Sequence, residues 1–320
     1  MLFRSLLAIA LFAVCCCSQW TENTIGSTQE WYSVASSADG TNLVAAASQG
    51  NLWTSTDSGG SWTEDTIEGT QKWRSVASSA DGANLVAAVY SGKLWTSDDY
   101  GRSWTENNKK CCRDSQRWVS VASSADGTKL VAAAFRGNLW ISTNSGGDWT
   151  NLASKGISRL IWSSVASSAD GTTLVAAVYE GNLWTSTDSG GSWTSVGSTK
   201  KWYSVASSAD GTKLVAAVYD GNLWTSTDSG GSWTEDTTSV RIDAINSGYG
   251  GIGSVASSAD GTKLVAAVNN GNLWISADSG SSWTEDTSVG STKSWTSVAS
   301  SDDGTKLVAA VYDGNLWTST

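Results

Sequence analysis

The chain has 320 residues, of which 40% are apolar, and a formal net charge of −10. This acidity argues against a nucleic-acid partner, because nucleic-acid binding needs a basic surface. The sequence contains no histidine, which is the commonest general base and metal ligand in proteins. We therefore expect neither a metal site nor a cofactor.

The first residues have the pattern of a secretory signal peptide. Arg4 supplies the positive charge, and Leu6–Val14 is an apolar stretch too short to span a bilayer. Residues 15–18 are small and suit a cleavage region. We predict a signal peptide over residues 1–17 and a mature domain over residues 18–320, secreted or extracytoplasmic (periplasm, cell surface or lumen) and without a transmembrane anchor. A lipoprotein cysteine is the alternative, which the valine before the first cysteine disfavours.

One phrase, S-V-A-S-S-[AD]-D-G, recurs along the predicted mature chain. Its copies are 40 to 50 residues apart, a spacing that fits one four-stranded blade of a β-propeller. The valines of the copies are Val34, Val76, Val121, Val165, Val205, Val255 and Val298. We therefore predict an all-β fold, a seven-bladed β-propeller of four-stranded antiparallel blades.

Residues 202–237 illustrate how one repeat predicts one blade. Asp-Gly and Gly-Asn dipeptides separate the β-prone runs, and such dipeptides are typical of tight hairpins. The second run is apolar throughout, which suits a strand covered on both faces. We expect strand A at 202–208, strand B at 213–219, strand C at 223–227 and strand D from Trp233.

The 20 tryptophans occupy three positions of the repeat: the start of strand A, strand C and the start of strand D. A side chain this large at a repeated position usually fills an interface, so we expect the strand C and D sets to pack between blades. The strand A set lies nearer the mouth of the central channel. Trp202 and Trp295 are therefore candidates for stacking on a ligand, with core packing as the alternative.

The turn before strand D carries the pattern S-x-D-x-G-x-x-W. The pattern resembles the Asp-box, or BNR, repeat of sialidase-like β-propellers. That resemblance implies a structural hairpin staple away from any active site, in which the carboxylate accepts bonds from nearby backbone amides. The implied structural residues are Asp57, Asp99, Asn144, Asp188, Asp228 and Asp278.

The two ends of the predicted domain fit one another. The chain stops at Trp317–Thr320, shortly after another box begins, and residues 18–22 match the end of a box followed by strand D. We expect the N-terminal segment to complete the last blade and close the ring, which removes an open sheet edge. On this interpretation the sequence is complete, and we expect a monomer.

The connections from D to A and from B to C share one face of a propeller, and here they vary most between repeats. One candidate binding set on this face is basic, with ordinary solvated loop charge as the alternative. Its members are Lys109, Lys110, Arg113, Arg136, Arg159, Lys200 and Lys201.

A second candidate set pairs an aromatic ring with a carboxylate in the B–C turn. Such a pair suits a sugar, whereas plain hairpin chemistry is the alternative. Its members are Tyr179 with Glu180, Tyr219 with Asp220, and Tyr312 with Asp313. Cys111 and Cys112 are adjacent, so they are expected to be free thiols or an unusual vicinal bridge; a redox or metal role lacks further ligands.

Three function classes remain open. We favour a secreted, non-catalytic protein that recognises a protein or a glycan through the variable face. Photosystem assembly factors with a single propeller are similar in blade count and box use, but their face is lined by arginine, whereas the basic set here is mostly lysine. A sialidase-like glycoside hydrolase is the second class; strand A offers no paired carboxylates, and without proline the family's Arg-Ile-Pro motif is missing. A structural or surface repeat protein is the third.

Overall fold

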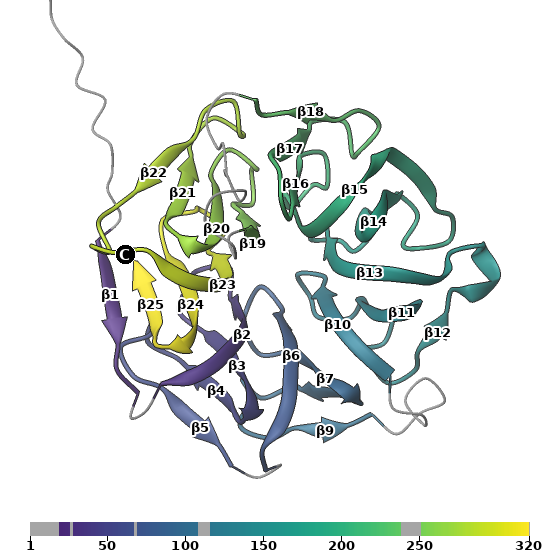
Figure 1. Cartoon of the computed structure of the whole chain (residues 1–320). Helices are drawn as coiled ribbons and strands as arrows, with labels where there is room; N and C mark the ends of the chain where they lie inside the picture. The colour runs from purple at the N-terminus through teal and green to yellow at the C-terminus, as the bar shows by residue number, and fades with distance from the viewer. Residues whose placement is uncertain (1–18, 26–27, 67–68, 108–115, 238–250, 320) are drawn as a thin grey trace, which may run out of the picture.

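The computed structural model describes residues 19–25, 28–66, 69–107, 116–237 and 251–319, which form an all-β structure as predicted (Figure 1). The predicted signal peptide and the two adjacent cysteines lie outside these ranges. Within them the one helical element is η2 (Ala153–Lys155). No helix in the described part of the chain has the length and apolarity needed to cross a membrane.

Strands of one repeat pair in antiparallel order into a blade, and the blades surround a central axis (Figure 1). The strand A segment is the inner strand of its blade, and the outer strands follow in chain order. The first blades contain β2 (Gln29–Ser36), β3 (Leu43–Gly50), β4 (Leu52–Ser55) and β5 (Thr63–Asp65); β6 (Gln71–Ser78), β7 (Leu85–Gly92), β8 (Leu94–Ser97) and β9 (Thr105–Glu106); and β10 (Gln116–Ser123), β11 (Leu130–Ser142) and β12 (Thr150–Asn151).

Some strands of the second half serve two positions. β14 continues from position B into position C, and β15 is the outer strand of one blade and then the inner strand of the next. The later blades contain β13 (Ser158–Ser167), β14 (Leu174–Ser186) and β15 (Thr194–Ser207); β16 (Leu214–Val218), β17 (Leu223–Ser226) and β18 (Thr234–Glu235); β19 (Ile252–Ser257), β20 (Leu264–Gly271), β21 (Leu273–Ser276) and β22 (Thr284–Asp286); and β23 (Lys293–Ser300), β24 (Leu307–Gly314) and β25 (Leu316–Ser319).

The core lies between adjacent blades. Every residue of β16 is buried, as the continuous apolar run predicts, and its alanines let neighbouring sheets approach closely. Tryptophans fill the remaining space: the rings of Trp202 and Trp224 meet edge to face with centroids 5.7 Å apart. Inner-strand tryptophans are 0% to 2% exposed at Trp31, Trp73, Trp118, Trp162, Trp202 and Trp295.

The N-terminal strand β1 (Trp20–Asn23) pairs with the C-terminal strand β25. Trp20 lies opposite Ser319, and its indole Nε1 donates to Asp286 Oδ2 at 2.9 Å. Its ring also lies 6.4 Å from that of Trp295, centroid to centroid. The first and last described strands therefore meet within one blade (Figure 1).

Backbone hydrogen bonds join successive A–B hairpins in a circuit. The N–H of Ala38 donates to the carbonyl of Ala80 at 2.8 Å, and the same bond recurs from each hairpin to the next. The N–H of Asp302 then donates to the carbonyl of Ala38 at 2.7 Å. The bonds therefore return to their starting point.

Serine hydroxyls form a second circuit between the inner strands. Ser33 Oγ accepts a bond from the N–H of Val76 at 3.1 Å, and Ser297 Oγ accepts one from Val34 at 3.1 Å. The intervening inner strands repeat the contact. A buried N–H needs an acceptor, so this bond explains why Ser-Val recurs in every copy of the repeat.

Candidate functional site

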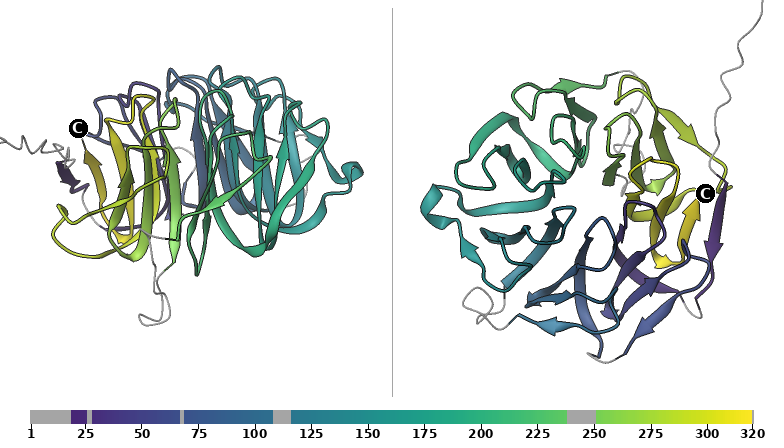
Figure 2. Two further views of the ribbon diagram at one scale, coloured as in Figure 1. Left: turned by 90° about the horizontal axis from the view of Figure 1, so that it is seen from above. Right: turned by 180° about the vertical axis from the view of Figure 1, so that it is seen from behind.

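The two ends of the propeller differ in what they contain. A–B hairpins and box turns share one end, which we call the hairpin face: the N–H of Ser58 donates to the Thr41 carbonyl at 3.0 Å, and that of Tyr100 to Ala83 at 3.1 Å. At the other end, the mouth face, each strand B ends beside the start of the next inner strand, as Phe135 does opposite Ile161. Figure 2 shows the two ends separated by the length of the strands.

On the hairpin face, each box aspartate bonds within its own turn. Asp57 Oδ1 accepts from the Ser61 N–H and the Ser55 hydroxyl, both at 2.8 Å, and its Oδ2 accepts from the Ser61 hydroxyl at 2.7 Å. The Ser61 hydroxyl is the main cause that holds the pKa of Asp57 below its ordinary value. Asp99, Asp188, Asp228 and Asp278 make the same bonds, and Asn144 keeps the two to its Oδ1. These carboxylates are committed to structure.

A cavity of about 510 Å³ lies on the mouth face, at the centre of the propeller. Every inner strand contributes to it, through the residue that follows the strand A tryptophan or its equivalent. Deeper along each inner strand lie the serines of the hydroxyl circuit, and Phe135, Tyr179, Tyr219 and Asn269 line the cavity from the ends of the B strands. The residues after the tryptophan position are Tyr32, Arg74, Val119, Ser163, Tyr203, Gly253 and Thr296.

A β-bulge aims this residue at the channel. In β2 the pairing with β3 shifts between Trp31 and Ser33, and the corresponding shift occurs in the other inner strands. A bulge leaves one residue outside the regular ladder and redirects its side chain. Tyr32 and its equivalents therefore project into the cavity while the tryptophan beside them packs between blades.

Aromatic rings gather on two sides of the cavity. On one side the ring centroids of Tyr203 and Tyr219 are 5.1 Å apart, and those of Tyr179 and Tyr219 are 6.5 Å apart. On the other side Tyr32 meets Tyr312 at 5.8 Å, and the guanidinium carbon of Arg74 lies 4.4 Å from the Tyr32 centroid. All of these residues except Tyr312 are half-buried, so each presents part of a ring to the cavity.

The rim of the mouth face has strained backbone. A non-glycine residue at the B–C turn adopts a positive φ in six blades, at 52° to 59°, where L residues usually lose about 1 kcal/mol or more. The box turns on the hairpin face contain non-glycine residues with the same sign of φ, at 54° to 64°, so the positive φ belongs to the repeated turns and does not set the mouth face apart. The rim residues are Gln49, Ser91, Arg136, Glu180, Asn270 and Asp313, and all six are exposed.

The ring-and-acid pairs lie at the mouth. Tyr179 and Tyr219 line the cavity, and Glu180 and Asp220 are exposed on its rim. Tyr312, 38% exposed, lies with Asp313 on the opposite side. Trp202 and Trp295, expected as candidates for stacking on a ligand, are 1% and 0% exposed and packed against other tryptophans; Trp295 forms part of the cavity wall, but neither ring is open to a ligand in this structure.

In the described ranges the basic residues of the candidate set make different local contacts. Lys201 Nζ lies 2.8 Å from Asp220 Oδ2, and Lys200 Nζ lies 4.7 Å from the Trp224 ring centroid. Arg136 lies beside the Phe135 ring and, like Arg159, is exposed. Lys109, Lys110 and Arg113 fall outside the described residues.

Sequence reasoning missed Tyr32, Arg74 and Tyr203. The signal was present: each occupies the one variable letter inside the constant phrase W-x-S-V-A-S. Ser163 and Thr296 use this position to bond to the next blade, but the repeat does not fix which residue stands there. This position is therefore where an individual function can be placed.

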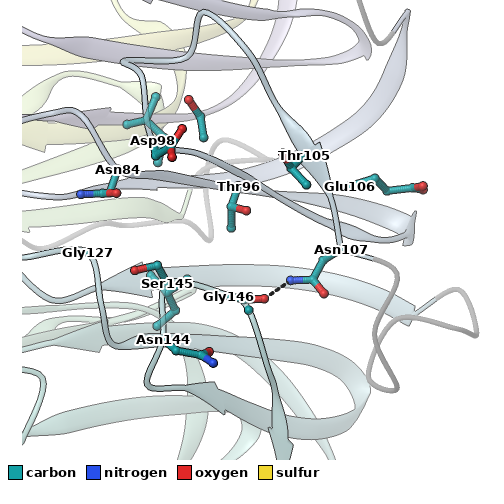
Figure 3. Close-up of a pocket in the computed structure, with 14 residues that line it drawn as sticks. Asn84, Thr96, Asp98, Thr105, Glu106, Asn107, Gly127, Asn144, Ser145 and Gly146 are labelled. Carbon is teal, nitrogen blue, oxygen red and sulfur yellow. Dashed lines mark hydrogen bonds between the residues drawn. The ribbon is translucent and has the colours of Figure 1, made fainter.

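A second cavity, of about 540 Å³, lies between the β6 blade and the box turn after β11 (Figure 3). Asn107 Nδ2 donates to the Gly146 carbonyl and so bridges the two blades. At its edge Glu106 pairs with Lys93 at 3.0 Å. Its lining belongs to one interface between neighbours, whereas all inner strands meet at the mouth cavity, which is therefore the better candidate site.

No cluster of three or more acidic or cysteine side chains that could hold a metal ion occurs among the residues the structure describes. Within that part of the chain, the lining of the mouth cavity likewise contains no aspartate or glutamate. What the cavity offers is ring faces, hydroxyl groups, the Asn269 amide and the Arg74 guanidinium. These groups suit recognition of a ligand by stacking and hydrogen bonding.

The sequence matches no protein-family model and no curated protein. Solved structures do resemble it. One is described as YCF48 bound to D1 peptide, with a TM-score of 0.72 and 17% identity over 94% of this chain and 97% of that one. YCF48 from Cyanidioschyzon merolae has a TM-score of 0.70 and 17% identity, covering 94% and 98%.

A third similar structure is the GH74 xyloglucanase from Xanthomonas campestris, with a TM-score of 0.73 and 19% identity. The match covers 94% of this chain and 53% of the xyloglucanase. Identities this low show the fold alone. The fold is a β-propeller.

Proposed function

We propose that this protein is a secreted, non-catalytic binding protein of the BNR/Asp-box type that recognises an extended segment of another protein at the mouth cavity. The observation that carries this proposal is the concentration of side chains that differ between repeats in one cavity. Ser163 and Thr296 of the mouth bond to a neighbouring blade, as many residues elsewhere in the repeat do. The half-buried Tyr203, Tyr219 and Arg74 present part of their side chains to the cavity, so these groups are available to a partner.

The proposed architecture is a monomeric, seven-bladed ring closed by the N-terminal strand. The pairing of β1 with β25 supports closure, as do the two hydrogen-bond circuits that return to their starting residues. The bonds of the box aspartates support the Asp-box assignment. A rigid ring of this kind holds the mouth residues in fixed positions, which lowers the entropy lost when a ligand binds.

A peptide ligand is favoured because the cavity combines half-buried tyrosines with an arginine and an amide, a set typical of protein interfaces. The YCF48 structure with a bound peptide shows that this fold can serve such a role. A glycan is the second candidate, because Tyr179 and Tyr219 each precede an exposed carboxylate, Glu180 and Asp220. Hydrolysis has less support, since a glycosidase needs two carboxylates at the scissile bond.

The test is a binding screen with the chain from residue 18 onward. A displayed peptide library and a glycan array are probed in parallel with the wild-type protein and with a Tyr203→Ala/Tyr219→Ala variant. Tyr100→Ala is the matched control, because Tyr100 is also half-buried but lies on the hairpin face. We expect peptide binding that the mouth variant loses and the control keeps.

Peptide binding that survives in the mouth variant would refute the proposed site. Signal confined to the glycan array, and lost in the mouth variant, would favour the second candidate. Release of sugar from a sialoside or β-glucan panel would favour the hydrolase. Secretion is tested separately, by fractionating cells that express the chain with and without residues 1–17; only the longer chain is expected outside the cytoplasm.

A further inference from the structure

We propose that the Tyr179, Tyr203 and Tyr219 side of the mouth cavity is a subsite for a cationic side chain, arginine or lysine, of the bound peptide. This inference rests on the proposed function and adds the chemistry of one contact. Three half-buried tyrosine rings converge there. The ring centroid of Tyr219 lies 5.1 Å from that of Tyr203 and 6.5 Å from that of Tyr179. A cation placed over such rings is attracted by their quadrupoles.

The molecule already makes this contact once, on the other side of the same cavity. There the Arg74 guanidinium lies 4.4 Å from the centroid of the Tyr32 ring, and Tyr32 meets Tyr312 edge to face. Tyr32 and Tyr203 occupy the same position of the repeat, directly after the strand A tryptophan. The Tyr203 ring is therefore placed at the mouth by the same position of the repeat as the Tyr32 ring, which holds the guanidinium.

Among the described residues, the position equivalent to Arg74 at the proposed subsite holds no cation. The residue that corresponds to Arg74, on the next inner strand after Tyr203, is Gly253 in β19. Gly253 lines the cavity, and a Cβ built there would lie 3.0 Å from the Trp295 carbonyl oxygen. β19 therefore presents bare backbone where β6 presents a guanidinium.

A second difference between the two sides of the cavity enlarges the aromatic surface of the subsite. Tyr219 stands at the end of β16, where the corresponding residue in β3 is Ser48. The subsite thus gains a ring in place of a hydroxyl, and it loses the arginine that would cover the rings. Both differences from the Tyr32 side favour a cation that comes from outside.

The local charge has the right sign. Glu180 and Asp220 directly follow two of the three tyrosines and are exposed on the rim, and Lys201 is the neighbouring cation, bonded to Asp220 at 2.8 Å. Lys201 pairs with Tyr179 across the strands, and the pKa of Lys201 is raised chiefly by Asp220, with smaller contributions from Tyr179 and Glu180. Glu180, Asp220 and Lys201 together carry a net charge of −1, and Lys200, whose backbone pairs with Gly181, directs its ammonium to the Trp224 ring 4.7 Å away.

The probes are two seven-residue glycine–serine peptides that differ in one central side chain. One carries arginine and the other carries citrulline, which has nearly the same shape but no charge. Binding to the chain from residue 18 onward is followed by the shifts of tyrosine ring signals in nuclear magnetic resonance titrations. We expect the arginine peptide to bind about fivefold or more tightly than the citrulline peptide.

Two variants locate the effect. Gly253→Arg places an arginine at the repeat position that Arg74 occupies in β6. The new guanidinium should pack on the tyrosine rings of the subsite. The affinity for the arginine peptide should then fall to the affinity measured for the citrulline peptide. Gly253→Ala adds the same Cβ, with the same approach to the Trp295 carbonyl, but no charge; it should keep the preference for arginine. Thermal unfolding of both variants checks that they are equally folded.

Equal affinity for the two peptides, absence of tyrosine shifts with the arginine peptide at about 10 mM, or an arginine preference that persists in Gly253→Arg would each overturn the inference. These results leave the proposed function standing if library peptides still bind at the mouth in a manner sensitive to Tyr203→Ala/Tyr219→Ala. Loss of all peptide binding would instead remove the proposed function. The two failures are therefore distinguishable.

Discussion

The hairpin face and the mouth face are built from the same repeats, yet they differ in how their side chains are used. On the hairpin face the aspartates, serines and backbone amides bond to one another in nearly the same way in each blade. On the mouth face the position after the inner-strand tryptophan varies: Ser163 and Thr296 donate to the carbonyls of Trp202 and Trp31 in the next blade, whereas the other blades place tyrosine, arginine, valine or glycine there. Residues that repeat in every blade are therefore structural here, and residues that vary between blades are the ones that a partner can contact.

Adjacent residues on one strand give the sharpest form of this comparison. Trp202 is 1% exposed and packs between blades, whereas Tyr203 is half-buried and lines the cavity. Trp202→Ala should reduce the free energy of unfolding by about 3–5 kcal/mol, because it leaves a large cavity. Tyr203→Ala should cost no more than about 2 kcal/mol. Denaturant titration measures both, and equal losses would break the distinction between the faces.

The serine circuit predicts an effect of intermediate size. In Ser120→Ala the N–H of Val165 loses the hydroxyl that accepts its bond at 3.0 Å. A buried donor left without an acceptor costs about 1–3 kcal/mol. Val119→Ala, one residue earlier and facing the cavity, is the matched control and should cost less. The stability difference between the two variants is read from the same denaturant titrations; a larger loss in the control would contradict the structural role of the serine.

Acid should weaken the hairpin face in particular. The Ser168 hydroxyl, followed by the Thr172 amide and hydroxyl, lowers the pKa of Asp170 from 3.8 to about 2. A lowered folded-state pKa means that the stabilisation is complete above the unfolded value near 3.8 and is lost as the pH falls toward 2. The thermal midpoint of the wild-type protein should therefore drop across this window.

Asp170→Asn isolates the contribution of this one group. The variant should be less stable than the wild type at pH 7. The difference in stability should shrink toward zero as the pH falls to about 2 and below, because the wild-type carboxylate then becomes protonated and loses its charge. The carboxylate is largely exposed, so solvent screening keeps the effect small. Thermal midpoints at the two pH values measure it, and a difference that does not depend on pH would show that the charge of Asp170 contributes nothing.

The smallest predicted effect concerns the strained rim. Glu180 has a φ of 57°, which glycine adopts without strain. Glu180→Gly should therefore leave stability unchanged or raise it by up to about 1 kcal/mol, after the entropy of glycine in the unfolded chain is subtracted. Glu180→Ala keeps the strain and should not gain. If Glu180→Gly were clearly destabilising, the side chain would be a structural residue and would belong with those of the hairpin face.

The repeat period, the turn dipeptides and the apolar B strands were enough to predict an all-β propeller. These features act locally or between identical neighbours: Asp-Gly selects a hairpin, and Leu214–Val218 needs cover on both sides. The strand C and D tryptophans pack in the clusters between blades, as expected, whereas burial of the strand A residues Trp202 and Trp295 was not anticipated. The burial of a tryptophan depends on the distance between its blade and the next blade. The sequence of one repeat does not predict this distance.

The sequence by itself determined which segments become strands, because each repeat carries its own turns and its own buried face. Only the tertiary structure decided which variable residues meet, because Tyr32, Arg74, Tyr203 and Gly253 come from different blades and converge only when the inner strands surround one axis. The bulge after each inner-strand tryptophan directs them there, and it arises from pairing with the neighbouring strand. Each repeat contributes only one of these variable residues to the site. The site therefore cannot be predicted from any single repeat before the blades are placed around that axis.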